Sequence, residues 1–590
     1  MLLSGLTLPT CLLVLALLQS YAPRLAEDAI LRRVLNCIAA TPVTVWLLLG
    51  TTAFVLPVLE YWITAKSHGN ALAGFLPWAD ATEYFQCSQV FLLGLDGPAH
   101  CAKRPYYFAF FADLLWLTGN KLQLALLVQA LCVGAVATLF ARHMFRLYGL
   151  PAALAAISVI FAYAAALCSG LVMTENIGLI LGIFGLSLIL RYTQTPDPAL
   201  FLAGIALLAA AMSARPGPLF VLPALGAWYL FYGEGSIAKR LFVALGAGVV
   251  SALAMALAAS PILIAGGGFG STHSNFSYSL YGLVVGGKGW LQVTVDHPEI
   301  FNRSDGISQT DKVYKLAFES LWEKPHLFVL GYLKGIAKYF DALFRYTSDF
   351  KPLRLGLLLP LWICGAWFAL RRWRELQYSL LLAIIAGIVV SSPFLIYDAH
   401  NRAFASTVAV DALLVALGVV WICERLHAPT RGGTSGRHRP ENARGLAAAG
   451  LSALVLPVAM FAAIRPASAP AALKPPECVD GQTAVALRLS QGTLVLPLVA
   501  SGKEQIYPLA VRADHFGERF HRWVHAKEEL AEIPGTTLIW GIRLERGSKA
   551  ELINFQWSGH VSAKKESIEV CLSTTQTGDK IRTLTEMRQK

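Results

Sequence analysis

Two carboxylates stand three residues apart in the segment 78–85, WADATEYF, where Asp80 and Glu83 lie among aromatic residues. Residues three apart face the same side of an α-helix. At a membrane surface, partial desolvation moves a carboxyl toward the pH range in which it acts as a general base. The same segment also fits a solvated amphipathic helix without chemistry. Asp80 is therefore a candidate catalytic base, and Glu83 a candidate substrate-binding residue.

Further charged residues recur in turns that follow apolar segments. They are Arg104 in KRPYY, Glu175 in MTEN, Arg215 before Pro-Gly-Pro, and both His400 and Arg402 in YDAHNR. Arginine suits bidentate recognition of phosphate, and a neighbouring histidine adds a hydrogen-bond donor. Each has an ordinary alternative, because Arg104 could anchor a loop at lipid headgroups and a glutamate at a wetted membrane boundary costs little.

Asp411 stands nine residues after Arg402, roughly 13 Å farther along a helix. An ionisable residue at that depth in a membrane is either functional or the buried partner of a residue such as Arg402. The segment 265–352 mixes aromatic, amide and glycine residues, which suits sugar binding but also an ordinary ordered loop. Its part 314–340 has apolar positions at helical spacing among lysines, and predicts an architectural interfacial helix along the outer leaflet.

The elements that position these residues are membrane helices. The chain has 590 residues, of which 55% are hydrophobic and 15% charged, whereas soluble proteins average roughly 25% charged. Apolar segments of about 20 residues predict membrane spans. We expect 11–12 of them, near 4–21, 42–60, 121–141, 150–168, 172–190, 198–213, 216–232, 240–264, 353–370, 376–396, 403–422 and 445–463.

Short basic loops orient these spans. The formal net charge is +12, but many Lys and Arg residues lie in short loops between apolar segments, where they mark the cytoplasmic side and not a nucleic-acid site. The opposite, outer side then receives the loops 61–120 and 265–352 and everything after about 465. We expect three parts: an N-terminal helix and cytoplasmic linker at 1–41, a transmembrane catalytic domain at 42–465, and an extracytoplasmic β-rich domain at 466–590.

The β-rich prediction rests on alternating apolar and polar residues near 483–489, 493–499, 537–543 and 567–572, the period of half-buried strands. Cysteines fit the same map. Cys87 and Cys101 share the first outer loop, and Cys478 and Cys571 bracket the C-terminal part, so both pairs are candidate disulfides in an oxidising compartment. Metal spacing such as C-x-x-C is absent from the sequence, and we predict no zinc site.

In order and topology, residues 42–425 resemble the GT-C superfamily of integral-membrane glycosyltransferases, in the branch that includes protein O-mannosyltransferases and aminoarabinose transferases. Asp80 matches the catalytic aspartate of the first outer loop in that family. Arg104-Pro105 loosely matches its basic-Pro-aromatic element, and Glu175 its acidic turn. Arg215-Pro216 matches the Arg-Pro turn, and Arg402 the late outer-facing arginine.

The resemblance implies transfer of a sugar from a polyprenyl-phosphate donor to an extracytoplasmic glycan, lipid or protein acceptor, by an inverting mechanism with Asp80 as base. Arg402, with Arg104, Arg215 or His400, would hold the lipid phosphate, while Glu83 and Glu175 would orient hydroxyl groups. No cofactor is implied, although a carboxylate-bound divalent ion stays open.

The likeness also suggests a bacterial inner membrane, with the C-terminal domain in the periplasm. The alternative function is a polytopic transporter or flippase, which would favour broken helices and polar sites at the membrane midplane.

Overall fold

The computed structural model describes residues 10–14, 16, 43–64, 70–72, 76–77, 80–92, 94, 99–265, 274–302, 306–350, 353–397, 400–425, 442–466, 482–488, 495–497, 537–544, 550–557, 567–573, 581–583 and 586–588. Eight helical segments in these ranges are long and apolar enough to cross a membrane, so the protein is a multi-pass helical membrane protein. They comprise α7 (Leu122–Tyr148), α8 (Leu150–Leu167), α9 (Glu175–Tyr192), α12 (Ile237–Ile264), η4 with α18 (Arg354–Leu358, Leu359–Arg371), α19 (Leu376–Leu395), η5 with α20 (His400–Thr407, Val408–Arg425) and α21 (Ala443–Ile464).

Three other predicted spans are apolar helices of lesser length. The predicted span 42–60 forms α3 (Val43–Ala53) and α4 (Leu56–Thr64), and the other two are α10 (Pro198–Ala214) and α11 (Val221–Tyr232). The 17 residues of α10 extend only about 26 Å, against a hydrocarbon layer of about 30 Å. Of the predicted span 4–21, the structure describes residues 10–14 and 16.

Glycines let the central helices approach closely. A Cβ on Gly365 of α18 would overlap the Leu414 carbonyl of α20, and a Cβ on Gly418 of α20 would overlap the Leu361 carbonyl of α18. Small residues at such contacts are how membrane helices gain packing energy. Between α7 and α8, Gly149 has φ +84°, a conformation that glycine adopts without strain, so the chain reverses there within one residue.

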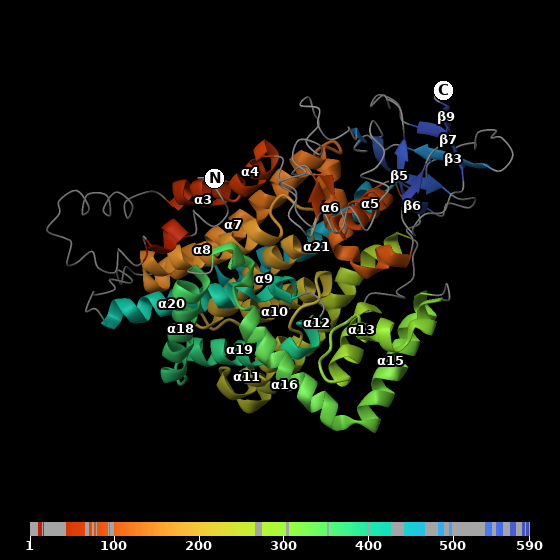
Figure 1. Cartoon of the computed structure of the whole chain (residues 1–590). Coiled ribbons are helices and arrows are strands. Elements are labelled where there is room, and N and C mark those ends of the chain that lie inside the picture. The colour runs from red at the N-terminus through yellow and green to blue at the C-terminus, as the bar shows by residue number, and fades with distance from the viewer. Residues whose placement is uncertain are drawn as a thin grey trace.

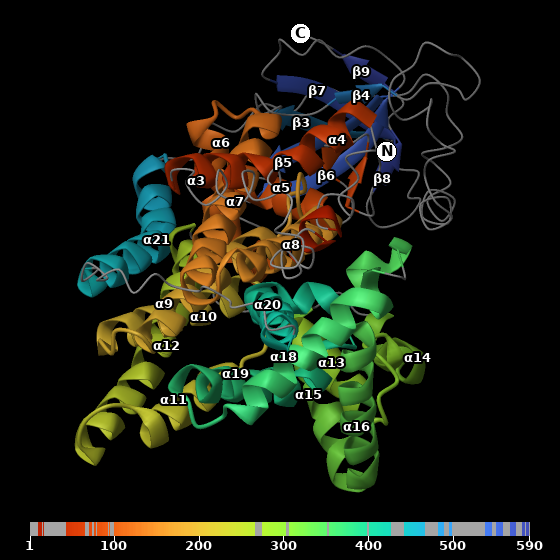
Figure 2. The ribbon, with the colours of Figure 1, turned by 90° about the vertical axis from the view of Figure 1, so that its left-hand side faces the viewer.

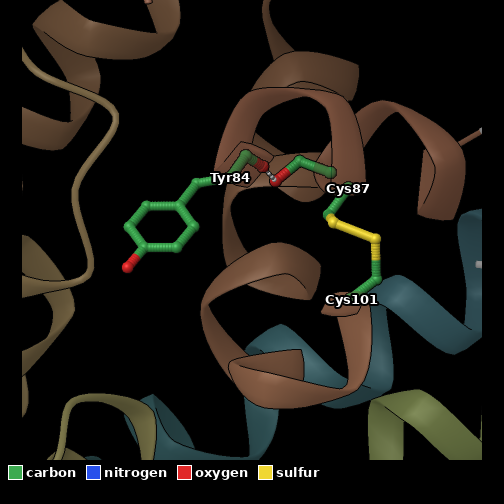
Figure 3. The surroundings of a disulfide bond; sticks show 4 residues. Tyr84, Cys87 and Cys101 are labelled. Carbon is green, nitrogen blue, oxygen red and sulfur yellow. Dashed lines mark hydrogen bonds between the residues drawn. A yellow bond between two sulfur atoms is a disulfide. The ribbon is translucent and has the colours of Figure 1, made fainter. Parts of the chain in front are cut away.

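The segment predicted to be the first outer loop is a folded unit built from β1 (Ala71–Leu72), β2 (Leu76–Pro77), α5 (Asp80–Leu92), η1 (Ala99–Lys103) and α6 (Pro105–Leu117). The predicted disulfide between Cys87 and Cys101 is present, with a Cα–Cα distance of 5.4 Å. Figure 3 shows it joining α5 to η1, with the Tyr84 ring pointing away from the bond. Helix α6 is anchored to the bundle because the Tyr106 hydroxyl donates to the Leu454 carbonyl of α21 at 2.8 Å.

The segment predicted to be the second outer loop contains α13 (Ser274–Val284), α14 (Gln292–Asp296), η2 (Pro298–Asn302), α15 (Gly306–Glu323), α16 (Pro325–Ala342) and η3 (Arg345–Phe350). The single helix predicted at 314–340 is two helices instead, broken before Pro325, because proline disfavours helical backbone in the residue before it. Figure 1 shows α15 and α16 as an open elbow at the lower right of the molecule.

The described C-terminal residues are strands of one sheet. They are β3 (Gln482–Arg488), β4 (Val495–Pro497), β5 (Thr537–Leu544), β6 (Ala550–Trp557), β7 (Ser567–Ser573), β8 (Ile581–Thr583) and β9 (Glu586–Arg588). The strand order is β8-β6-β5-β3-β7-β9, with β4 paired to β5. Strands β5 and β6 contact α5, and both ribbon views place the sheet beside the first outer loop (Figures 1 and 2). Cys478, and with it the predicted Cys478–Cys571 pair, lies outside the described residues.

Candidate functional site

Four of the sequence-predicted site residues form one ionic cluster. Arg402 donates through Nε to Glu175 Oε1, and its two terminal nitrogens lie 3.2 and 3.1 Å from Asp80 Oδ2. Arg215 approaches the same Glu175 oxygen at 3.7 Å. The four side chains come from segments up to 322 positions apart in the chain.

Exposure differs sharply among these side chains, which we call the arginine–carboxylate cluster. Glu175 is fully buried at 0% exposure and Arg215 is 8% exposed, whereas Arg402 is 26% and Asp80 51% exposed. Glu175 thus forms the inner floor of the cluster, and Asp80 is the carboxylate that solvent or a substrate can reach.

Local structure explains these positions. Asp80 and Glu175 are the first residues of α5 and α9, where a carboxylate interacts favourably with the positive end of the helix dipole. Arg215 caps the C-terminus of α10 in extended conformation. A Cβ on Gly178 of α9 would stand 3.2 Å from Ala405 Cβ and 3.6 Å from Arg215 Cβ, and one on Gly182 would overlap the Ser406 carbonyl. The bare face of α9 therefore lets η5, which carries Arg402, lie directly against it.

Aromatic side chains border the cluster on the side of the first outer loop. The Tyr84 ring lies 6.0 Å from the Tyr107 ring and 5.8 Å from that of Phe108. Burial raises the pKa of Tyr84, and the charge of Asp80 raises it further, while Arg215 and Arg104 oppose the shift. Tyr84 is a member of the site that sequence reasoning missed. The available signal was its place four residues after Asp80, on the same helical face.

The remaining predicted residues are Arg104, Glu83 and His400. Arg104 is buried at 7% exposure and is the N-cap residue of α6. One of its terminal nitrogens lies 2.7 Å from the Lys103 carbonyl. Its positive charge acts to lower the pKa of Tyr84. Glu83 is partly buried on α5. His400 is the first residue of η5, and its side chain lies outside the described part of the structure.

Asp411 is not the partner of Arg402. Its Oδ1 accepts a hydrogen bond from Trp362 Nε1 at 2.9 Å, because the indole of α18 faces this turn of α20 and Arg402 is already held by Asp80 and Glu175. Asp411 also lines a cavity of about 20 Å³ with Tyr163, Tyr339 and Tyr346, which is room for about one water molecule.

The cluster offers a specific combination of chemistry. An accessible carboxylate, Asp80, can accept a proton from a hydroxyl group, while the two guanidinium groups of the cluster can donate hydrogen bonds to oxyanions such as phosphate. Among the residues that the structure describes, no three His, Cys, Asp or Glu side chains gather as metal ligands.

Comparison of the sequence with models of known protein families and with curated proteins gives no match to either.

Proposed function

We propose that this protein is a membrane glycosyltransferase of GT-C type, which moves a sugar from a polyprenyl-phosphate donor to an extracytoplasmic acceptor by an inverting mechanism. One observation carries the proposal: the exposed carboxylate of Asp80 lies 3.1 Å from an arginine that a fully buried glutamate holds in place. A base and a phosphate-binding cation thus lie side by side, on elements assigned to the outer side of the membrane.

In the proposed reaction, Asp80 accepts the proton of the acceptor hydroxyl as its oxygen attacks the anomeric carbon. The bond from that carbon to the phosphate oxygen breaks, and the phosphate leaves with the electron pair. Arg402 and Arg215 stabilise the charge on the departing phosphate, as fixed cations do for developing anions. Arg104 and His400 are further phosphate-binding candidates, and Glu83 is a candidate for binding acceptor hydroxyls.

Asp80 and Arg402 neutralise each other in the structure as it stands. A donor phosphate would therefore have to replace Asp80 on the guanidinium, and this exchange would free the carboxylate to act as base. Glu175, which is wholly buried, would stay in place and keep Arg402 oriented. Donor binding and activation of the base are thereby linked in the proposal.

The proposal includes a location: a bacterial inner membrane, with the β-rich domain at 466–590 in the periplasm. In its support, the sheet contacts α5 of the outer loop, and that loop contains a disulfide, which is typical of oxidising compartments. The opposite ends of α18 and α20 carry arginines stacked on tryptophans, Arg371 on Trp367 and Arg425 on Trp421, as expected of basic cytoplasmic ends with aromatic interface anchors.

The test uses the full-length protein in nanodiscs, with a panel of polyprenyl-phosphate hexoses and pentoses. Mass spectrometry measures release of polyprenyl phosphate and the gain of one sugar on the acceptor. We expect Asp80→Asn to abolish transfer and Asp311→Asn, a matched change of an exposed carboxylate on α15, to leave it unchanged. Transfer by the Asp80 variant at the wild-type rate would refute the mechanism. Transport of a lipid-linked sugar without any transfer would favour a flippase.

A further inference from the structure

Helix α16 has three distinct faces. Gly331, Gly335, Tyr339 and Ala342 are buried against the protein, and Gly335 packs on Pro393 of α19. A second face is apolar yet exposed, with exposed fractions of 56% for Val329, 45% for Leu330, 59% for Leu333 and 41% for Phe340. The third face is basic and carries Lys334 and Lys338, one helical turn apart.

The exposed apolar face continues the lipid-facing surface of a membrane span. The hydroxyl of Tyr332 donates to the Val390 carbonyl of α19 at 3.0 Å, and Val390 is itself 42% exposed. Since α19 is long and apolar enough to cross a membrane, its exposed apolar side chains near that end face lipid. The apolar face of α16 belongs to a helix hydrogen-bonded to that end of α19, and an exposed apolar face beside a membrane span is suited to contact with lipid.

The basic face next to it carries excess positive charge. Lys334 Nζ donates to the Gly286 carbonyl at 3.2 Å, and Lys338 Nζ lies 4.3 Å from the centre of the Tyr397 ring. The acid of this face, Asp341, is already ion-paired with both Arg345 and Arg354. Burial and the charge of Lys334 lower the pKa of Lys338, as expected when two ammonium groups share one surface.

We propose that Lys334 and Lys338 bind the phosphate of an anionic phospholipid in the outer leaflet, while the exposed apolar face of α16 contacts its acyl chains. The geometry suits a lipid: an apolar stripe and a basic stripe run side by side along one helix. Bound lipid would stabilise the position of α16. Because Lys338 lies over the Tyr397 ring, the lipid would also stabilise the turn that leads, five residues later, to Arg402. The site is thus a lipid-binding site distinct from the arginine–carboxylate cluster, and it does not depend on the proposed reaction.

The experiment titrates the purified full-length protein with phosphatidylglycerol and, separately, with phosphatidylcholine, and measures binding by native mass spectrometry. Each basic side chain near a bilayer surface contributes a factor of about five in affinity. We therefore expect the double variant K334Q/K338Q to bind phosphatidylglycerol about 30-fold more weakly, with phosphatidylcholine binding unchanged. The matched control K312Q/K315Q removes two exposed lysines of α15 and should bind like wild type.

Charge-retaining K334R/K338R should restore binding, which separates a charge effect from a folding defect. Equal binding by K334Q/K338Q and wild type, or an equal loss in the α15 control, would overturn the proposal. So would a marked preference of this face for polyprenyl phosphate over phosphatidylglycerol in competition, because the site would then belong to the donor.

Discussion

Neutralising each of the two carboxylates of the arginine–carboxylate cluster should change the stability of the protein by very different amounts. Glu175 is wholly buried and faces two arginines. Glu175→Gln leaves those guanidiniums without their buried counter-charge, and breaking a buried ion pair on one side costs about 3–5 kcal/mol. Asp80 is half exposed, and an ion pair of that kind contributes about 0–1 kcal/mol. Glu175→Gln should therefore be at least about 2 kcal/mol less stable than Asp80→Asn.

The assay is denaturation of both full-length variants in the same mixed micelles, followed by tryptophan fluorescence, with sugar transfer measured on the same preparations. Asp80→Asn should be nearly as stable as wild type but inactive, whereas Glu175→Gln should be clearly destabilised. Because uncompensated charge is the cause, the double variant E175Q/R402Q should recover part of the loss. Equal denaturation midpoints for the two single variants would refute the view that Glu175 is the structural carboxylate and Asp80 the chemical one.

Three further outcomes follow from other parts of the molecule. Serine replacement of both residues of the Cys87–Cys101 disulfide, which closes a loop with a sequence separation of 14, should cost about 3 kcal/mol of unfolding free energy; an unchanged denaturation midpoint would contradict this. Burial raises the pKa of Asp113 to about 8, so the folded state binds this proton more tightly than the unfolded state does. The free energy of unfolding of the wild type should therefore fall as the pH rises from 4 to 8. Asp113→Asn should remove that slope and gain up to roughly 4 kcal/mol at pH 7, and a parallel pH profile for the two proteins would count against it. Gly182→Ala would overlap a backbone carbonyl of η5 and should cost about 1–3 kcal/mol together with most sugar transfer, whereas Gly248→Ala, with open space around its Cβ, should be neutral in both assays.

Much of the cluster could be predicted from the sequence because charge is conspicuous in an apolar chain. Glu175, Arg215 and Arg402 stand at turns between apolar segments, where an ionisable residue needs a partner or water, and alternation of the spans places all three on one side with Asp80. Which of them pair could not be predicted. The pairing depends on helix rotation and on the close approach that Gly182 permits.

Asp411 illustrates the limit. Its depth in an apolar segment predicts a buried partner, and the helical rise suggests Arg402 as one possibility. In the structure the partner of Asp411 is Trp362 instead, because the indole N–H of that residue on α18 faces this turn of α20. Helix α10 is the contrasting case, because the predicted span 198–213 agrees with the observed helix Pro198–Ala214, which ends just before Arg215.

The arginine–carboxylate cluster balances two guanidiniums against two carboxylates, and this has a kinetic consequence. A locally neutral site exerts little long-range attraction on an anion, so it cannot by itself accelerate the diffusion of an anionic ligand toward the protein. Its arginines act only at contact range, after a carboxylate has been displaced. Within the described residues, α16 differs from the cluster, because no carboxylate is ion-paired with its Lys334 or Lys338. Raising ionic strength should therefore slow the capture of anions at that helix, while leaving the lifetime of anything already held by Arg402 almost unchanged.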